Sequence, residues 1–436
     1  MSDRSQFIKQ VLFTALWIRL TWCFVADEII PPLGELTSYI NLLFDAVIVI
    51  LGLITIRDKR DLIIATIALA FTAVTTIIFN GMDLLFYLNG MRDFIAYIFI
   101  MPILRYFMQD ERQWQDFTAS FDKSLFIFLV IQVFCIVEQF IRYGAGDHVG
   151  GSLGNWHSGI ISTLIYASSF YLLQKRIDPD RLLKSISDNF ILILLLIPTF
   201  LNETKISFLF LALYFLLIIP INRKIFIRLI FAVPVLLLLL WGGATAYVVA
   251  TGGSMGDVFS LDYYIEGYLI ADGDDNEKYA KWLVDNDSDE VEDIPRFTKF
   301  LLLEEVFEEN PGHQLVGYGV GHFKGGTIVP DSDFFNDYKW LFIGTVPYAF
   351  HVIIQVGFIG LMLTLAFFIW LILVPQDKIL ERDNNLQLFI LFSILLLYLY
   401  TDSLRNAYME LFFLYFIAQS WPQSIHAPQT NDNPTA

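Results

Sequence analysis

The feature that most constrains this chain is a succession of long apolar runs along its 436 residues. A helix needs about 20 mostly apolar residues to cross a bilayer core, and only helices and closed barrels satisfy their backbone hydrogen bonds in lipid. The runs lie near 7–26, 38–56, 62–80, 82–107, 121–143, 153–174, 188–202, 205–221, 226–250, 346–374, 386–400 and 406–421. They predict an all-α polytopic membrane protein of about 12 transmembrane helices. No internal repeat and no helix interrupted at mid-membrane is evident.

The composition agrees with this class. Hydrophobic residues make up 56% of the chain and charged residues 17%, below the roughly 25% of soluble domains; the mean hydropathy is +0.57. Disorder, a disulfide scaffold and an ordinary cytosolic enzyme are excluded. The two cysteines, Cys23 and Cys135, lie inside apolar runs, so we expect no disulfide framework or metal cluster. The first run ends at Ala26-Asp27-Glu28 without a signal-peptide cleavage site.

Every basic connection follows an even-numbered run, and the alternate connections at 26–37, 144–152 and 251–345 are acidic or rich in glycine. The positive-inside rule then places both termini in the cytoplasm. The chain divides into a bundle of about nine helices (1–250), a large outer loop (251–345), three C-terminal helices (346–421) and a cytoplasmic tail (422–436).

The outer loop holds most of the net charge of −17. It contains 20 Asp and Glu against 6 Lys and Arg, a difference of −14, which argues weakly against nucleic acid as a partner. Its second half predicts an amphipathic helix over 294–310, with Phe297, Phe300, Leu301 and Val306 apolar and Lys299 on the polar face. The glycine-rich turn 317–321 follows.

Ionisable groups within a bilayer cost about 2.5–3.5 kcal/mol each, so they are candidates for function. These are Arg19, Asp45, Arg92, Asp93 and Glu138. Glu138 and Arg142 are four residues apart and can pair on one helix face. A structural ion pair is the favoured interpretation, and a transporter's proton relay is the alternative. Asp45 is a candidate partner for Arg92.

Three cations, Lys205, Arg296 and Arg405, fall on the outer side, where the charge rule does not favour them. The run 386–400 is short for a bilayer core, so the turn after it, 401–406, is expected below the membrane surface, lining a polar cavity. Converging Lys and Arg there fit an anionic lipid headgroup, above all a diphosphate. The alternative for each cation is snorkelling at the surface.

Four histidines, His157, His313, His322 and His351, lie on or near the outer face. No pair has the spacing of zinc ligands, so we expect no metal. A neutral histidine can act as general base toward a sugar hydroxyl. For His351, whose neighbours are apolar apart from Gln355, helix packing is the favoured role.

Four segments together resemble the superfamily of O-antigen polymerases and ligases, which assemble bacterial surface polysaccharide. They are the glycine–aromatic opening of a helix at 151–158, the Thr-Lys step within 202–207, the loop arginine at 295–297 with the Gly-x-Gly-x-Gly-x-Phe pattern at 317–323, and the Gly-x-x-Gly at 355–361. The likeness covers roughly residues 150–365. The family's Asn-Pro-Asn is replaced here by Asn155-Trp156-His157.

The resemblance implies a membrane-embedded C-type glycosyltransferase of the bacterial inner membrane. It would move a glycan from undecaprenyl diphosphate to the non-reducing end of a newly arrived lipid-linked repeat, on the periplasmic side. It implies no nucleotide sugar and no cofactor; the partners are the lipid-linked glycan, membrane lipid and a chain-length regulator protein. We take Arg296, His322 and His351 as the catalytic candidates and expect Lys205, Arg296 and Arg405 to bind the diphosphate. Lys205 and Arg296 match positions of the family, whereas Arg405 matches none of its motifs.

Ligases carry a histidine eleven positions before the first glycine of the last motif, where this chain has Val346. The departure favours polymerase over ligase and leaves the general base unassigned. The roles of Arg92, Glu138, Arg142 and His157 are structural or substrate-binding. Aromatic residues of the loop are candidates for stacking on sugar rings or anchoring at the interface: Tyr263, Tyr264, Tyr268, Trp282 and Trp340. A flippase or other transporter of lipid-linked glycan is the main alternative, and a non-enzymatic scaffold is the third.

Overall fold

The computed structural model describes residues 3–218, 294–373, 384–401, 404 and 408–419, apart from short gaps at 145, 147, 155–156, 179–180, 203–204, 309–310, 324–328 and 343. All regular elements in these ranges are helical. The predicted run 226–250 and the first half of the outer loop lie outside them.

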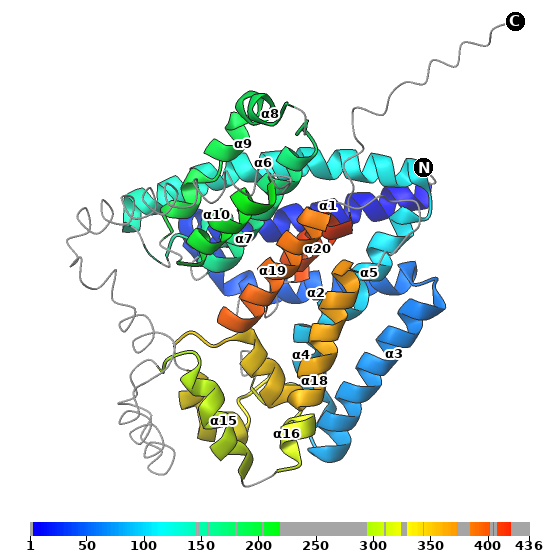
Figure 1. Ribbon diagram of the computed structural model, residues 1–436. Coiled ribbons are helices and arrows are strands. Elements are labelled where there is room, and N and C mark those ends of the chain that lie inside the picture. The colour runs from blue at the N-terminus through cyan, green and yellow to red at the C-terminus, as the bar shows by residue number, and fades with distance from the viewer. Residues whose placement is uncertain are drawn as a thin grey trace, which may run out of the picture.

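The first part of the chain forms long helices joined by tight turns (Figure 1). Their bounds are α1 Asp3–Phe24, continued by a π-helical turn Val25–Ile29; a 3-10 turn Pro31–Leu36 and α2 Thr37–Thr55; α3 Lys59–Ala73, continued by a π-helical turn Val74–Phe79; α4 Leu84–Met91; a 3-10 turn Arg92–Phe94; α5 Ile95–Met108; and α6 Glu111–Tyr143. The predicted helix over 82–107 is therefore divided, and its segments Leu84–Phe94 and Ile98–Met108 are bent by 47° relative to each other.

The second part contains mostly shorter helices and one long helix, α18. They are a 3-10 turn Gly151–Leu153, α7 Ser158–Gln174, α8 Leu182–Asp188, α9 Phe190–Leu194, a 3-10 turn Ile197–Phe200, α10 Lys205–Ile218, α15 Thr298–Glu308, α16 His313–Val316, α17 Asp333–Tyr338, a 3-10 turn Lys339–Phe342, α18 Tyr348–Leu373, α19 Asn384–Tyr400 and α20 Tyr408–Gln419.

Within the described residues, five helices are long and apolar enough to cross a membrane. These are Asp3–Ile29, Pro31–Thr55, Lys59–Phe79, Glu111–Tyr143 and Tyr348–Ile372; the bent pair Leu84–Phe94 and Ile98–Met108 makes a sixth if counted as one span. The protein is thus consistent with a helical membrane protein. Other predicted runs fold as shorter apolar helices, such as Phe190–Phe200, Leu209–Ile218 and Asn385–Tyr400.

Local sequence explains where the longest helix begins. The Asp110 carboxylate accepts hydrogen bonds from the backbone N–H groups of Arg112 (2.9 Å) and Gln113 (3.4 Å). This N-cap satisfies donors that the helix leaves without a partner. As a result α6 begins at Glu111 and not at 121, and its polar first turns precede the apolar run.

Aromatic residues of α6 and α20 form the centre of the bundle. The ring of Phe121 lies 3.7 Å from that of Phe416 and 5.0 Å from that of Phe413, centroid to centroid, and Phe117 packs against Phe416 at 5.6 Å. All four are buried. Such rings bury large apolar areas and hold α6 against the C-terminal helix.

Basic residues gather at one end of the bundle, as the charge pattern predicts. An Arg4 guanidinium nitrogen donates to the Ile54 carbonyl (3.2 Å), Arg57 donates to Gln109 (3.3 Å), and Arg60 lies over the Trp370 ring. These contacts join the starts of α1, α3 and α6 to the ends of α2, α5 and α18. We refer to this as the basic end.

The described part of the outer loop packs on the first turns of α18 at the opposite end, and Figure 1 shows α15 and α16 there together. Leu302, Leu303, Val306 and Phe307 of α15 are buried against residues that include Ile353. A helix is confirmed within the predicted range, and Val306 is buried as predicted. Two residues lie on the opposite side from the prediction: Leu301 is exposed and Lys299 is fully buried.

Helix α18 is interrupted at Gly357, whose φ of 66° and ψ of −173° are not helical. The interruption leaves backbone carbonyls of α18 without a donor from their own helix. The glycine-rich turn supplies donors instead: the N–H groups of Tyr318 and Gly319 donate to the carbonyls of Ile354 (2.8 Å) and Gln355 (2.9 Å). Gly357 lies inside a candidate membrane span. Non-helical backbone within a span is tolerated only when other parts of the protein form hydrogen bonds with its polar groups. The expectation of uninterrupted helices was therefore wrong.

Candidate functional site

The strongest candidate site surrounds Arg296, in the turn before α15. Its guanidinium carbon lies 4.2 Å from the centre of the Tyr400 ring, and Nη2 donates to the Thr345 hydroxyl at 3.3 Å. Nε is buried and has no hydrogen-bond partner among the described residues. A buried donor on a fixed cation favours an anionic ligand, because leaving it without a partner costs free energy. We call Arg296, Thr345, Tyr348 and Tyr400 the Arg296 site.

The ends of two helices hold this site together. The Tyr348 N–H, at the start of α18, donates to the carbonyl of Thr401 just after α19 (2.8 Å). The Tyr348 hydroxyl donates to the Asp93 carbonyl (3.3 Å) between α4 and α5. Arg296 thus lies at the C-terminal end of α19, where the helix dipole favours a cation.

Arg92 lies in the same turn as Asp93, but its charge is already matched. Its Nε forms an ion pair with Asp45 of α2, as the sequence predicts. Removing either partner would leave the other charged group uncompensated, so the pair joins α2 to the bend between α4 and α5. Arg19 is also buried, and its guanidinium contacts the Cys23 sulfur at 3.3 Å.

Lys205 begins α10, and α10 runs antiparallel to α19. The Asn385 amide donates to the Leu217 carbonyl (3.0 Å), and the rings of Phe210 and Phe389 lie 6.3 Å apart. The backbone of Lys205 therefore lies at the end where α19 stops, the same end as Arg296. The Lys205 side chain and the whole of Arg405 lie outside the described residues, so their convergence on Arg296 stays a prediction.

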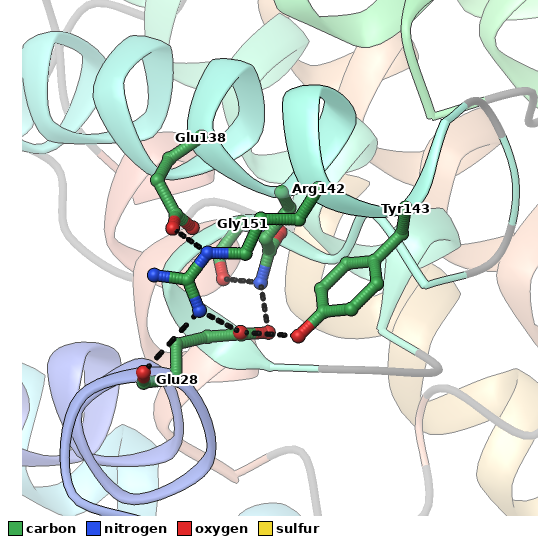
Figure 2. A network of polar contacts seen from close by, with 6 residues as sticks. Glu28, Glu138, Arg142, Tyr143 and Gly151 are labelled. Atoms are coloured by element: carbon green, nitrogen blue, oxygen red, sulfur yellow. Dashed lines mark hydrogen bonds and ion pairs between the residues drawn. The ribbon is translucent and has the colours of Figure 1, made fainter.

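Glu138 and Arg142 form the predicted ion pair, and the structure adds a second carboxylate, Glu28 (Figure 2). The Glu28 side chain is only 2% exposed; it accepts from Arg142 Nη1 (3.3 Å) and the Tyr143 hydroxyl (2.7 Å). Gln139 exchanges hydrogen bonds with the backbone of Gly151, donating at 3.2 Å and accepting at 2.7 Å. The network joins the π-helical turn after α1, α6 and the turn before α7, and whether it also binds substrate stays a prediction.

His157 precedes the first residue of α7 and is partly buried; it lies close enough to Asp27 to interact electrostatically. His351 is 2% exposed, with its ring 5.3 Å from that of Phe342. This burial among aromatic rings suits the packing role. The described residues contain no group of three or more His, Cys, Asp or Glu able to hold a metal ion.

His322 lies in the glycine-rich loop, with its ring 5.5 Å from that of Phe334. Burial first, and the nearby charge of His313 second, lower the pKa of His322 to about 4. Its Nδ1 is buried without a hydrogen-bond partner in the described part of the chain. The imidazole is therefore neutral at pH 7 and has a nitrogen available for a proton or a ligand.

The glycine-rich turn is a packing device. A side chain on Gly317 would meet the backbone of Gln355 at 2.4 Å, and one on Gly321 would meet the Phe86 carbonyl oxygen at 2.2 Å. Asn80, after α3, also binds this turn, donating to the Gly317 carbonyl (3.3 Å) and contacting His313 Nε2 (2.9 Å). The glycines therefore allow the backbone of residues 317–321 to pack closely between α3, α4 and the interruption in α18.

Around Arg296, the sequence analysis did not identify two neighbouring side chains, and elsewhere it misjudged one aromatic residue. Nothing in the pattern pointed to Tyr400 as the ring beneath Arg296, or to Lys299 as a buried lysine one helical turn after it. Trp340 is 3% exposed within the core beside α18, so neither sugar stacking nor membrane anchoring suits it. The other four aromatic candidates lie outside the described residues. No model of a known protein family matches the chain, and no curated protein matches it.

Proposed function

We propose that this protein is a glycosyltransferase that polymerises lipid-linked oligosaccharide repeats at the outer face of a bacterial inner membrane. The observation that carries the proposal is the Arg296 site: a guanidinium fixed on a tyrosine ring, with a buried donor and no carboxylate partner among the described residues. Such a group suits the diphosphate of a polyisoprenyl donor.

The reaction forms a bond between an acceptor hydroxyl oxygen and the anomeric carbon of the donor glycan. The bond from that carbon to the diphosphate oxygen breaks, and the electron pair leaves with the lipid diphosphate. Arg296 would stabilise this developing charge, which is usually the largest catalytic contribution. Lys205 and Arg405 complete the proposed diphosphate-binding group.

The acceptor's proton goes to a general base. His322 is neutral at pH 7 and has a buried Nδ1 without a hydrogen-bond partner in the described structure. A pKa of about 4 makes it a weak base, however, so a residue outside the described ranges is an equal candidate. His351, buried among rings, is the weaker histidine candidate.

The proposed topology has about 12 spans, both termini in the cytoplasm and residues 251–345 in the periplasm. It rests on basic connections that gather at one end of the described bundle, away from Arg296. Reporter fusions at Ser254 and Asp333 test it. Activity at both sites from a reporter that works only in the cytoplasm would refute it.

A transporter of lipid-linked glycan is the second candidate. The interrupted α18 and the bend between α4 and α5 favour it, because transporters often build their sites on discontinuous helices. Ligation to lipid A-core is the remaining alternative.

Purified protein in nanodiscs, supplied with lipid-linked repeat alone, separates these functions. A polymerase produces lipid-linked glycan of two or more repeats and releases polyisoprenyl diphosphate. A transporter produces no new glycosidic bond but moves the repeat across proteoliposomes, and a ligase requires added lipid A-core. Absence of polymer from folded, inserted protein would refute the proposal.

A further inference from the structure

We infer that the polyisoprenyl chain of the lipid substrate lies in a groove between α3, α5 and α18. The inference rests on the proposed function and adds the place where the membrane-embedded part of the substrate binds. The groove has a volume of about 230 Å³ and is lined from α3 by residues such as Ile67, Ala68 and Phe71, and from α18 by Gly360 and Leu363.

The lining of the groove suits a ligand without polar groups. Its only hydroxyls, those of Thr72 and Thr364, donate to carbonyls of their own helices, Ala68 at 2.7 Å and Gly360 at 3.0 Å. A polar ligand would find no free partner there and would lose its hydration. A hydrocarbon chain has no hydrogen bonds with water to lose, and it gains contact with the apolar side chains of the groove.

The groove opens toward lipid. Ile67 lines it and is nevertheless 55% exposed, and its neighbours Leu62 and Ile63 on α3 are exposed as well. Both α3 and α18 belong to candidate membrane spans. A hydrocarbon chain can therefore enter sideways from the bilayer without crossing water.

The groove and the Arg296 site adjoin at the turn before α5. Phe94 lines the groove, and the carbonyl of the preceding residue, Asp93, accepts the Tyr348 hydroxyl. Tyr348 is bound to Thr401, next to the Tyr400 ring beneath Arg296. This continuity favours a lipid whose diphosphate reaches Arg296, and therefore the polyisoprenyl substrate over a bulk phospholipid.

The test uses the full chain in nanodiscs of phosphatidylethanolamine and phosphatidylglycerol, with a diazirine-bearing polyisoprenyl diphosphate that carries no sugar. We expect label on groove residues of α3, α5 and α18, competed by unlabelled polyisoprenyl phosphate and not by extra phosphatidylglycerol. Label elsewhere, or equal competition by phosphatidylglycerol, would overturn the inference.

Matched variants sharpen the test. Ala68→Trp and Leu363→Trp fill the groove, while Ala70→Trp and Met362→Trp place the same bulk on exposed positions beside it. Loss of contact with two methylene groups of the ligand lowers affinity about tenfold. We therefore expect labelling to fall at least tenfold in both groove variants and to stay near the wild-type level in both controls. Folded groove variants that label like wild type would overturn the inference.

The labelling outcome is independent of the proposed reaction. Label in the groove without polymer formation would leave the groove assigned and refute the polymerase. Polymer formation without label in the groove would refute the groove and leave the polymerase standing.

Discussion

A guanidinium lies over an aromatic ring at each end of the bundle, yet the two arginines are matched differently. At the basic end, Arg105 lies 5.5 Å from the centre of the Trp370 ring and forms an ion pair with the buried Asp61. At the other end, Arg296 lies 4.2 Å from the Tyr400 ring and has only the Thr345 hydroxyl as hydrogen-bond partner in the described structure.

The difference separates a cation that an internal carboxylate neutralises from one that has no carboxylate partner among the described residues, as the proposed diphosphate site requires. Asp61 neutralises the charge of Arg105. Tyr400 and Thr345 orient Arg296 without neutralising it. Arg142 resembles Arg105, because its charge is also neutralised by internal carboxylates, those of Glu28 and Glu138.

The largest expected effect is on catalysis at Arg296. A lost charge-assisted contact to a buried phosphate costs about 2–5 kcal/mol in the transition state. Arg296→Ala should therefore slow polymerisation on the order of 30-fold to several thousand-fold. Arg296→Lys should recover only part, because a point charge replaces a planar fork. Lys205→Ala and Arg405→Ala should lose rate in the same direction.

The measurement is the initial rate of polymer formation from purified lipid-linked repeat, with each variant shown to be folded and inserted. Near wild-type rates in all three alanine variants would refute the diphosphate-binding group.

Asp61→Ala tests the other side of the comparison, because it leaves Arg105 buried and charged. Breaking a buried pair costs about 3–5 kcal/mol of folding free energy, and we expect a loss in that range, seen as earlier thermal unfolding in detergent. The Asp61→Asn, Arg105→Met double variant should recover much of it. Asp116, half exposed in its pair with Lys9, supplies the control: Asp116→Ala should cost about 1 kcal/mol or less. Equal losses in both alanine variants would contradict the comparison.

His322 predicts a dependence of stability on pH. Its pKa is lowered to about 4 in the fold, mainly by burial, while an unfolded histidine titrates near pH 6.5. Between these values the unfolded chain binds more protons, so stability from this group is full above about pH 6.5 and falls as the pH drops toward 4. We expect His322→Gln to flatten the pH dependence of the unfolding temperature between pH 7 and 5; a profile parallel to wild type would contradict this.

The smallest effect is expected at His351. His351→Gln keeps a polar side chain of similar size among the rings of Phe342 and Phe350, so polymer length should stay nearly unchanged. His351→Asp places a carboxylate in a 2% exposed position and should damage folding, because burying a charge without a partner is costly. A folded but inactive His351→Gln protein would assign the histidine a catalytic role.

The sequence by itself determined the helical membrane class, most helix positions in the described ranges and the pairs that lie within one helix. Apolar runs reveal membrane helices because each residue contributes its own free energy of transfer from water to lipid. Glu138 and Arg142 form a pair because a helix brings positions four residues apart onto one face. The Arg92–Asp45 pair was also predictable, because a buried charge requires a partner and the apolar runs contain few acidic residues.

The tertiary structure alone decided the contacts between distant segments. Glu28 contacts Arg142, Arg296 lies over the Tyr400 ring, and Lys299 is buried although the sequence pattern places it on the polar face of α15. Gly357 interrupts α18 where the glycine-rich turn supplies backbone donors for the freed carbonyls of Ile354 and Gln355. Hydropathy could not reveal these features, because it measures preference for lipid over water and contains no information on which helix faces meet.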